Sequence, residues 1–154
     1  MRGKELYDGA IPSGNSVALL NLGRLSRLTG NTAYADRAQR LANAFSGMVR
    51  RQPSAFTQFL SGLDFAFGPT HEIVVTGKRD ECRDMLRAVQ QAFRPNAVVI
   101  FLPADTHLDE LAPYTEGMTP RDGKPTAYVC REFSCQQPTT EIETMLEYLE
   151  GSNQ

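Results

Sequence analysis

The chain has 154 residues, of which 41% are hydrophobic and 22% charged, and these values suit one globular domain. Sixteen basic and eighteen acidic side chains leave a net charge of −2, so no positive field draws the chain to nucleic acid or to an anionic membrane. Its apolar runs are far shorter than the roughly 20 residues of a membrane span, and its first residues lack the apolar stretch of a secretion signal. We therefore expect a cytoplasmic protein without nucleic-acid or membrane contacts.

Residues 1–69 are predicted to form a helical segment. A first helix begins near Ser13 or Asn15, either of which can cap it, and it runs to about Leu28, where residues 29–31 end it. A second helix over residues 32–49 carries one apolar stripe and a polar face, and the short connection predicts an antiparallel hairpin with the first. A third helix begins at Pro53 and ends before Gly68.

Apolar side chains cover most of the circumference of the first predicted helix, at about 100° of rotation per residue. The two helices that follow can each cover only one stripe of it. Part of its apolar surface should therefore stay exposed, so that the chain forms a homodimer or needs missing upstream domains as its partner. The apolar positions are Val17, Leu20 and Leu28 on the main face, Leu22 and Leu25 beside it, and Leu19 further round.

Residues 70–154 are predicted to form a small α/β segment. The pattern indicates strands near residues 72–76, 97–102 and 126–130, of which the second is apolar throughout and is expected to be buried on both faces. The intervening helices are expected over 80–93 and 106–114, with a last one from Thr140. This alternation predicts a three-stranded, mainly parallel βαβαβα sheet. The fold class is then α+β or α/β, with the helical and α/β segments packed as one compact unit.

The loop before the first helix holds the candidate ligand-binding residues. Glycines permit close approach of a ligand to the backbone, and free N–H groups at a helix start attract polar groups. An ordinary capped helix start explains the same residue types, and no Gly-Lys-Ser/Thr follows to make a phosphate loop. The candidates are Asp8, Ser13, Gly14, Asn15 and Ser16.

Cys130 and Cys135 are the candidate redox residues, but four residues separate them, unlike the Cys-x-x-Cys of a thioredoxin-type site. Free thiols are the favoured interpretation, with a reversible disulfide and a zinc site as alternatives, and we expect neither a metal nor a cofactor. His71 and His107 have no partner at ligand or catalytic spacing and are expected at the surface or in a cap.

Three stretches resemble a known family. They are YDGAIPSGNS at 7–16, LDFAFGP at 63–69 and AYVCREFSCQ at 127–136. Their order and spacing are similar to the C-terminal end of large thioredoxin-domain-containing proteins related to the spermatogenesis-associated family. Members of that family carry a thioredoxin-like domain followed by an (α/α)6 toroid that is similar to N-acylglucosamine 2-epimerases and other six-hairpin sugar enzymes.

The resemblance implies that this chain is a C-terminal fragment with about one and a half of the six helical hairpins. The loop from Asp8 to Ser16 would then line the central funnel of the toroid, near a small polar or sugar-like ligand of carbohydrate metabolism. No catalysis is expected from the fragment alone. Two alternatives stay open: a non-catalytic α/β module for packing or partner binding, and a dithiol redox protein that uses Cys130 and Cys135.

Overall fold

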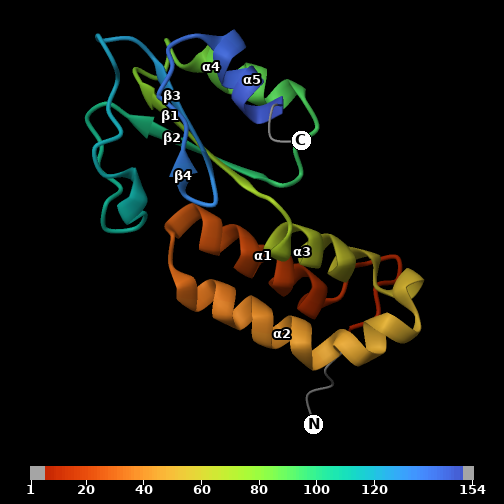
Figure 1. The fold of residues 1–154 in the computed structure, drawn as a ribbon. Coiled ribbons are helices and arrows are strands. Elements are labelled where there is room, and N and C mark those ends of the chain that lie inside the picture. The colour runs from red at the N-terminus through yellow and green to blue at the C-terminus, as the bar shows by residue number, and fades with distance from the viewer. Residues whose placement is uncertain (1–5, 151–154) are drawn as a thin grey trace. The chain divides into compact units, whose positions relative to one another are not determined.

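The computed structural model describes residues 6–150 (Figure 1). By its internal contacts the chain divides into two compact units. A helical unit contains residues up to 27 and residues 31–68. A sheet unit contains residues 28–30 and those from 69 onward. The five helices and the mixed sheet give an α+β fold, as predicted. No helix of residues 6–150 is long and apolar enough to cross a membrane.

The helical unit contains the three predicted helices, but the third begins at Thr57 and not at Pro53. These are α1 over Gly14–Thr29, α2 over Thr32–Arg51 and α3 over Thr57–Phe67, with the short 3-10 helix η1 over Pro53–Ala55 before the last. The Asn31 side chain caps α2 by accepting the Ala33 N–H at 2.9 Å, which satisfies one of its unpaired N–H groups. Only residues 30 and 31 connect α1 to α2, so the connection is short, as the sequence predicts.

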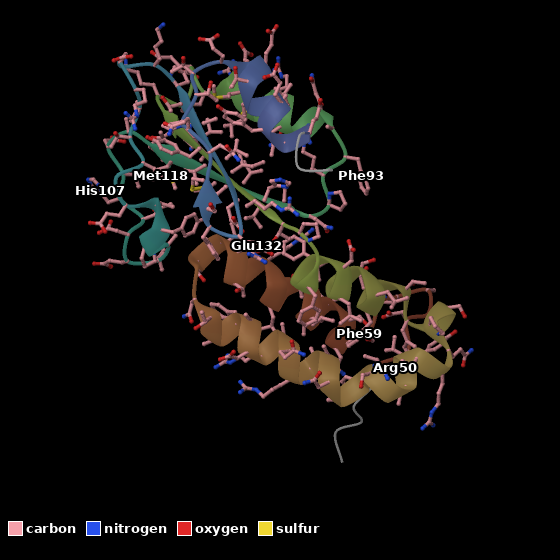
Figure 2. The ribbon with its side chains drawn as sticks, in the orientation of Figure 1. Arg50, Phe59, Phe93, His107, Met118 and Glu132 are labelled. Carbon is pink, nitrogen blue, oxygen red and sulfur yellow. A yellow bond between two sulfur atoms is a disulfide. The ribbon has the colours of Figure 1, made fainter. Side chains whose placement is uncertain are left out.

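The buried side of α1 differs from the predicted one. Leu19 is fully buried, together with Ser16 and Gly23, so the side placed furthest from the predicted main face is the one in the core. The reason is close packing: a Cβ at Gly23 would lie 3.0 Å from the Phe65 ring, and one at Gly62 would lie 3.0 Å from Leu19. The core of this unit consists chiefly of Leu19, Ala42, Phe45, Val49, Phe56 and Phe59, the last of them labelled in Figure 2.

The sheet unit contains four strands in the order β2-β1-β3-β4. These are β1 over His71–Gly77, β2 over Ala97–Pro103, β3 over Thr126–Arg131 and β4 over Ser134–Cys135. β1 and β2 pair in parallel around α4, residues Arg83–Gln91, which confirms the predicted βαβ unit. β3 pairs antiparallel with β1, and β4 pairs antiparallel with β3. The predicted three-stranded, mainly parallel sheet is therefore wrong, since the sheet is mixed.

The missing crossover helix explains the direction of β3. Residues 106–114 were expected to be helical, but the only helix there is the 3-10 helix η2 over Pro113–Thr115. One helical turn forms where the Ala112 N–H donates to Leu108, and Pro113, which has no N–H of its own, follows directly. Without a crossover helix the chain does not return to the other end of the sheet. β3 therefore starts at the end where β2 stops, and it runs antiparallel along the free side of β1.

The two faces of the sheet have different covers. Helices α4 and α5, the latter over Ile142–Glu150, cover the face that carries Ile73, Val75 and Val129 (Figure 1). The segment between β2 and β3 contributes Met118 to the cluster on the other face. β2 lies at the edge, where Val99 is 37% exposed, so the expectation that this strand is buried on both faces is wrong.

Candidate functional site

The carboxylate of Asp8 connects the candidate ligand loop to the starts of two helices. One oxygen accepts the Ser13 N–H at 2.9 Å, just before α1. The other oxygen accepts the Phe59 N–H at 3.0 Å, in the first turn of α3. The Asp8 N–H also donates to the Ala55 carbonyl at 3.0 Å. These hydrogen bonds fix the loop to the starts of both helices.

Ser13 is the N-cap of α1. Its hydroxyl oxygen accepts the Ser16 N–H at 3.1 Å and lies 2.8 Å from the Ser16 hydroxyl, and both serines are buried. Capping by Ser13 is thus confirmed. The alternative cap Asn15 lies inside the first helical turn instead, because α1 already begins at Gly14.

The hydrogen bonds at Asp8 decide its charge. Burial raises the pKa of its carboxyl group, but N–H donation from Ser13 and Phe59 and hydroxyl donation from Ser16 and Ser13 lower it, and the net pKa lies below the ordinary 3.8. Asp8 is therefore an anion at neutral pH and stabilises two helix N-termini. These bonds suit a structural anchor better than a proton donor in catalysis.

The rest of the candidate loop offers a surface. Gly14 is exposed and Asn15 is half-buried, while Ser13 and Ser16 are committed to the cap. Ile11, in the middle of the loop, is 82% exposed. The exposed side of α1 continues from Gly14 through Val17, Asn21 and Leu25. The structure thus brings the five candidate residues together, and Asp8, Gly14 and Asn15 are at least partly accessible to solvent.

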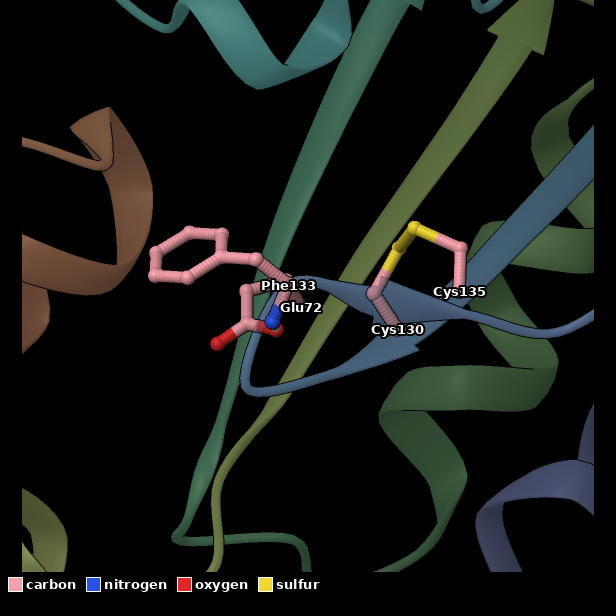
Figure 3. The surroundings of a disulfide bond; sticks show 4 residues. All are labelled: Glu72, Cys130, Phe133 and Cys135. Atoms are coloured by element: carbon pink, nitrogen blue, oxygen red, sulfur yellow. Dashed lines mark hydrogen bonds between the residues drawn. A yellow bond between two sulfur atoms is a disulfide. The ribbon is translucent and has the colours of Figure 1, made fainter.

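The candidate redox pair is a disulfide in the structure (Figure 3). Cys130 and Cys135 lie directly opposite each other on β3 and β4, with their Cα atoms 3.8 Å apart. The predicted proximity is confirmed, and the favoured free thiols are wrong. The remaining cysteine, Cys82, is free and buried. Burial raises the pKa of its thiol, and the negative charge of nearby Glu81 raises it by a smaller amount.

Glu72 is fully buried on β1, and no pattern in the sequence predicted this burial. Its Cα is the antiparallel partner of that of Cys130, and its carboxylate accepts the Phe133 N–H at 3.0 Å from the turn between β3 and β4 (Figure 3). Burying a carboxylate is costly unless hydrogen bonds compensate it, so this contact ties the turn to the centre of the sheet. The one feature of the sequence that could have indicated this buried carboxylate is an acidic residue at the start of a β-branched run.

Tyr114 lies close to this carboxylate. Burial, and to a smaller extent the negative charge of Glu72, raises the pKa of the Tyr114 hydroxyl to about 12. The hydroxyl has no hydrogen-bond partner among residues 6–150, and the Tyr114 ring meets the Phe133 ring edge-on at 5.1 Å. The tyrosine therefore packs as an aromatic residue against the turn.

A cavity of about 300 Å³ lies at the carboxyl ends of the parallel strands β1 and β2. Thr76, Leu102, His107 and Met118 are among its lining residues. His71 lies at the opposite end of β1, where burial and the charges of Arg131 and Arg94 lower its pKa. The structure therefore keeps the two histidines apart. Within the described residues no three His, Cys, Asp or Glu side chains gather as a metal-binding group.

These features define an α+β chain with a capped polar loop and a disulfide hairpin, and comparisons place that chain beside longer proteins. Human spermatogenesis-associated protein 20 is 32% identical over 145 residues, which are 92% of this chain and 18% of the human protein. The rat protein of the same name is 30% identical over the same shares. An uncharacterised Caenorhabditis elegans protein is 26% identical over 93% of this chain and 20% of its own length.

The chain is thus similar to one stretch of spermatogenesis-associated protein 20 and spans about a fifth of the length of these relatives. No protein-family profile matches it, and no solved structure matches it significantly. The resemblance to the spermatogenesis-associated proteins is confirmed at this level. The thioredoxin-like domain and the toroid stay predictions.

Proposed function

We propose that this chain is a non-catalytic part of a larger protein, in which its first helix and the preceding loop form one wall of a pocket for a small polar, sugar-like ligand. The other walls come from protein outside these 154 residues. The observation that carries the proposal is the exposed side of α1, which begins at the anchored loop and bears apolar side chains.

That side of α1 has the composition of an incomplete interface. Val17 is 40% and Leu25 is 39% exposed, and Asn21 lies between them on the same side. Burying a Val or Leu side chain contributes about 1.5–3 kcal/mol, so exposed apolar residues beside a fixed loop favour a partner surface. Without that partner, the same side supports a homodimer, since a two-fold axis buries a patch against its copy.

The similarity to longer proteins supports the choice of partner. Human spermatogenesis-associated protein 20 is matched over only 18% of its length, so most of that protein has no counterpart in this chain. The loop supports the ligand class: exposed Gly14 and half-buried Asn15 present a backbone and an amide group, which suit hydroxyl groups of a ligand.

Co-expression tests the interface. The chain is produced together with human spermatogenesis-associated protein 20 from which the matching stretch is deleted, and size-exclusion chromatography with light scattering measures the complex. We expect a 1:1 complex that is lost in the double variant Val17→Asp/Leu25→Asp. Phe93→Asp is the matched control, because Phe93 is 92% exposed in the sheet unit (Figure 2). A complex lost equally in the control, or never formed by the unchanged chain, contradicts the proposal.

Thermal unfolding of the same complex tests the ligand. Monosaccharides and their 2-acetamido derivatives should raise the melting temperature of the complex and leave that of the isolated chain unchanged. Asn15→Ala should reduce the increase. An equal increase in the isolated chain would place the ligand site wholly within these residues and refute the shared pocket.

A further inference from the structure

The two cysteines of the disulfide differ in exposure. Cys130 is 1% exposed and packs in the cluster with Val74 and Tyr128, whereas Cys135 is exposed on the two-residue strand β4. β4 is also the last strand in the sheet order. Cys135 is therefore the more accessible of the two cysteines for an incoming thiolate.

We propose that Cys130–Cys135 is a thiol–disulfide exchange site, attacked at Cys135 by a dithiol reductant, and that its reduction opens the β3–β4 hairpin. The proposal is independent of the pocket beside α1, since all its residues belong to the sheet unit.

The reaction proceeds by two displacements. A thiolate of the reductant attacks Cys135 Sγ, the protein S–S bond breaks, and Cys130 leaves as a thiolate that takes up a proton. The second thiolate of the reductant then attacks the reductant sulfur that is bonded to Cys135 Sγ. Cys135 leaves as a thiolate and is protonated. Two electrons and two protons pass to the protein, and the reductant becomes a disulfide.

The turn within the hairpin explains why reduction should open it. Glu132 and Phe133 have φ angles of 52° and 63°, in the left-handed region that favours glycine. A two-residue turn with both residues in this region matches the twist of a hairpin, but its usual residues are Asn-Gly. β4 has only two residues and pairs only with β3, so the disulfide closes the hairpin where it has few strand pairs, in addition to the contacts of Phe133 and the hydrogen bond from the Gln136 N–H to the Val129 carbonyl.

The turn also carries the contact to the buried carboxylate. The Phe133 N–H donates to Glu72 at 3.0 Å, and the Phe133 ring packs on Tyr114. If the turn relaxes, Glu72 loses this donor while it remains in the centre of the sheet. Reduction therefore changes the surroundings of a buried charge as well as the edge of the sheet.

The site of attack is tested with two single variants of the full chain. In Cys130→Ser the exposed Cys135 is left as a thiol, and in Cys135→Ser the buried Cys130 is left. Each variant is mixed with glutathione disulfide, and mass spectrometry follows the mixed disulfide. We expect Cys130→Ser to react at least about tenfold faster. Equal rates, or a faster reaction of Cys135→Ser, overturn the assignment.

Opening is tested by amide hydrogen exchange before and after reduction with dithiothreitol. We expect the Phe133 and Ser134 amides to exchange about tenfold faster in the reduced chain, while the amides of β1 stay protected. The variant Glu132→Asn/Phe133→Gly supplies the residues that this turn prefers, so its Ser134 amide should respond less. Unchanged exchange in the reduced chain, or an equal response of the variant, overturns the opening.

Discussion

Replacement of Asp8 tests the anchor of the candidate loop. Its two carboxylate oxygens accept the N–H groups of Ser13 and Phe59 at 2.9 and 3.0 Å, so one side chain serves the starts of α1 and α3. In Asp8→Ala both N–H groups lose their acceptor. In Asp8→Asn one oxygen remains and the negative charge is lost.

The magnitude follows from the number of caps. Loss of one N-cap costs about 0.5–2 kcal/mol, and Asp8 supports two helices while remaining partly exposed to solvent. We expect Asp8→Ala to lower the free energy of unfolding of the helical unit by about 2 kcal/mol, and Asp8→Asn by about 1 kcal/mol.

The effect should depend on pH. The pKa of Asp8 is lower in the folded chain than the ordinary 3.8, so its stabilisation is fully present above that value and is lost as the pH falls through the folded pKa. The difference in unfolding free energy between the unchanged chain and Asp8→Asn should therefore be largest near neutral pH and shrink as the pH falls through the lowered pKa of Asp8.

Urea unfolding followed by circular dichroism at 222 nm measures both effects. Asp36→Ala is the control, because Asp36 is exposed on α2 in the same unit and should change stability by less than about 0.5 kcal/mol. If Asp8→Ala and Asp36→Ala cost the same, or if the cost of Asp8→Asn does not shrink as the pH is lowered stepwise from 7 into the acid range, the capping argument is refuted.

Three further substitutions have defined outcomes. Ser13→Ala should lower the unfolding free energy by about 1 kcal/mol in the same assay, because it removes the α1 cap. Tyr114→Phe should leave the chain as stable or raise its stability by up to about 1 kcal/mol, since the removed hydroxyl is buried without a partner among the described residues, and it should delete a phenol that titrates near pH 12 in absorbance at 295 nm. Gly77→Ala should cost about 1–3 kcal/mol, because φ is 143° there and the added Cβ would lie 2.9 Å from the sulfur of Cys82; a cost near zero by urea unfolding would show that the strand end adapts.

Local sequence patterns predicted the five α-helices and the strands β1, β2 and β3, because helix caps and β-branched runs are local signals, but they also predicted a helix over residues 106–114 that does not form. Asn31 and the turn at residue 30 mark a helix boundary, and β-branched runs mark β1 and β2. The direction of β3 was predicted wrongly, since it depends on whether residues 106–114 form a crossover helix, and Pro113 limits them to single turns. Strand order likewise depends on pairing across the sheet, which no short pattern contains.

The candidate site shows the same division. Ser13 was predicted as a cap from its residue type, but the Asp8 contact to Phe59 joins residues 51 positions apart and could not be predicted from local spacing. The sequence pattern placed Leu19 off the main apolar face of α1. It is buried because α1 and α3 approach closely at Gly23 and Gly62, a contact that the pattern does not contain. Glu72 and the Cys130–Cys135 bond likewise depend on pairing between strands.

Hydrogen exchange in the co-expressed complex tests the central claim most directly, since it shows where the partner protein covers this chain. With the truncated human relative bound, we expect slower exchange of amides in the loop over residues 9–11 and along α1 as far as Leu25. Amides of α5 in the sheet unit should exchange at the rates of the isolated chain and serve as the internal reference. A stable complex in which the loop and α1 exchange as fast as before, with protection elsewhere, would contradict the proposed shared pocket.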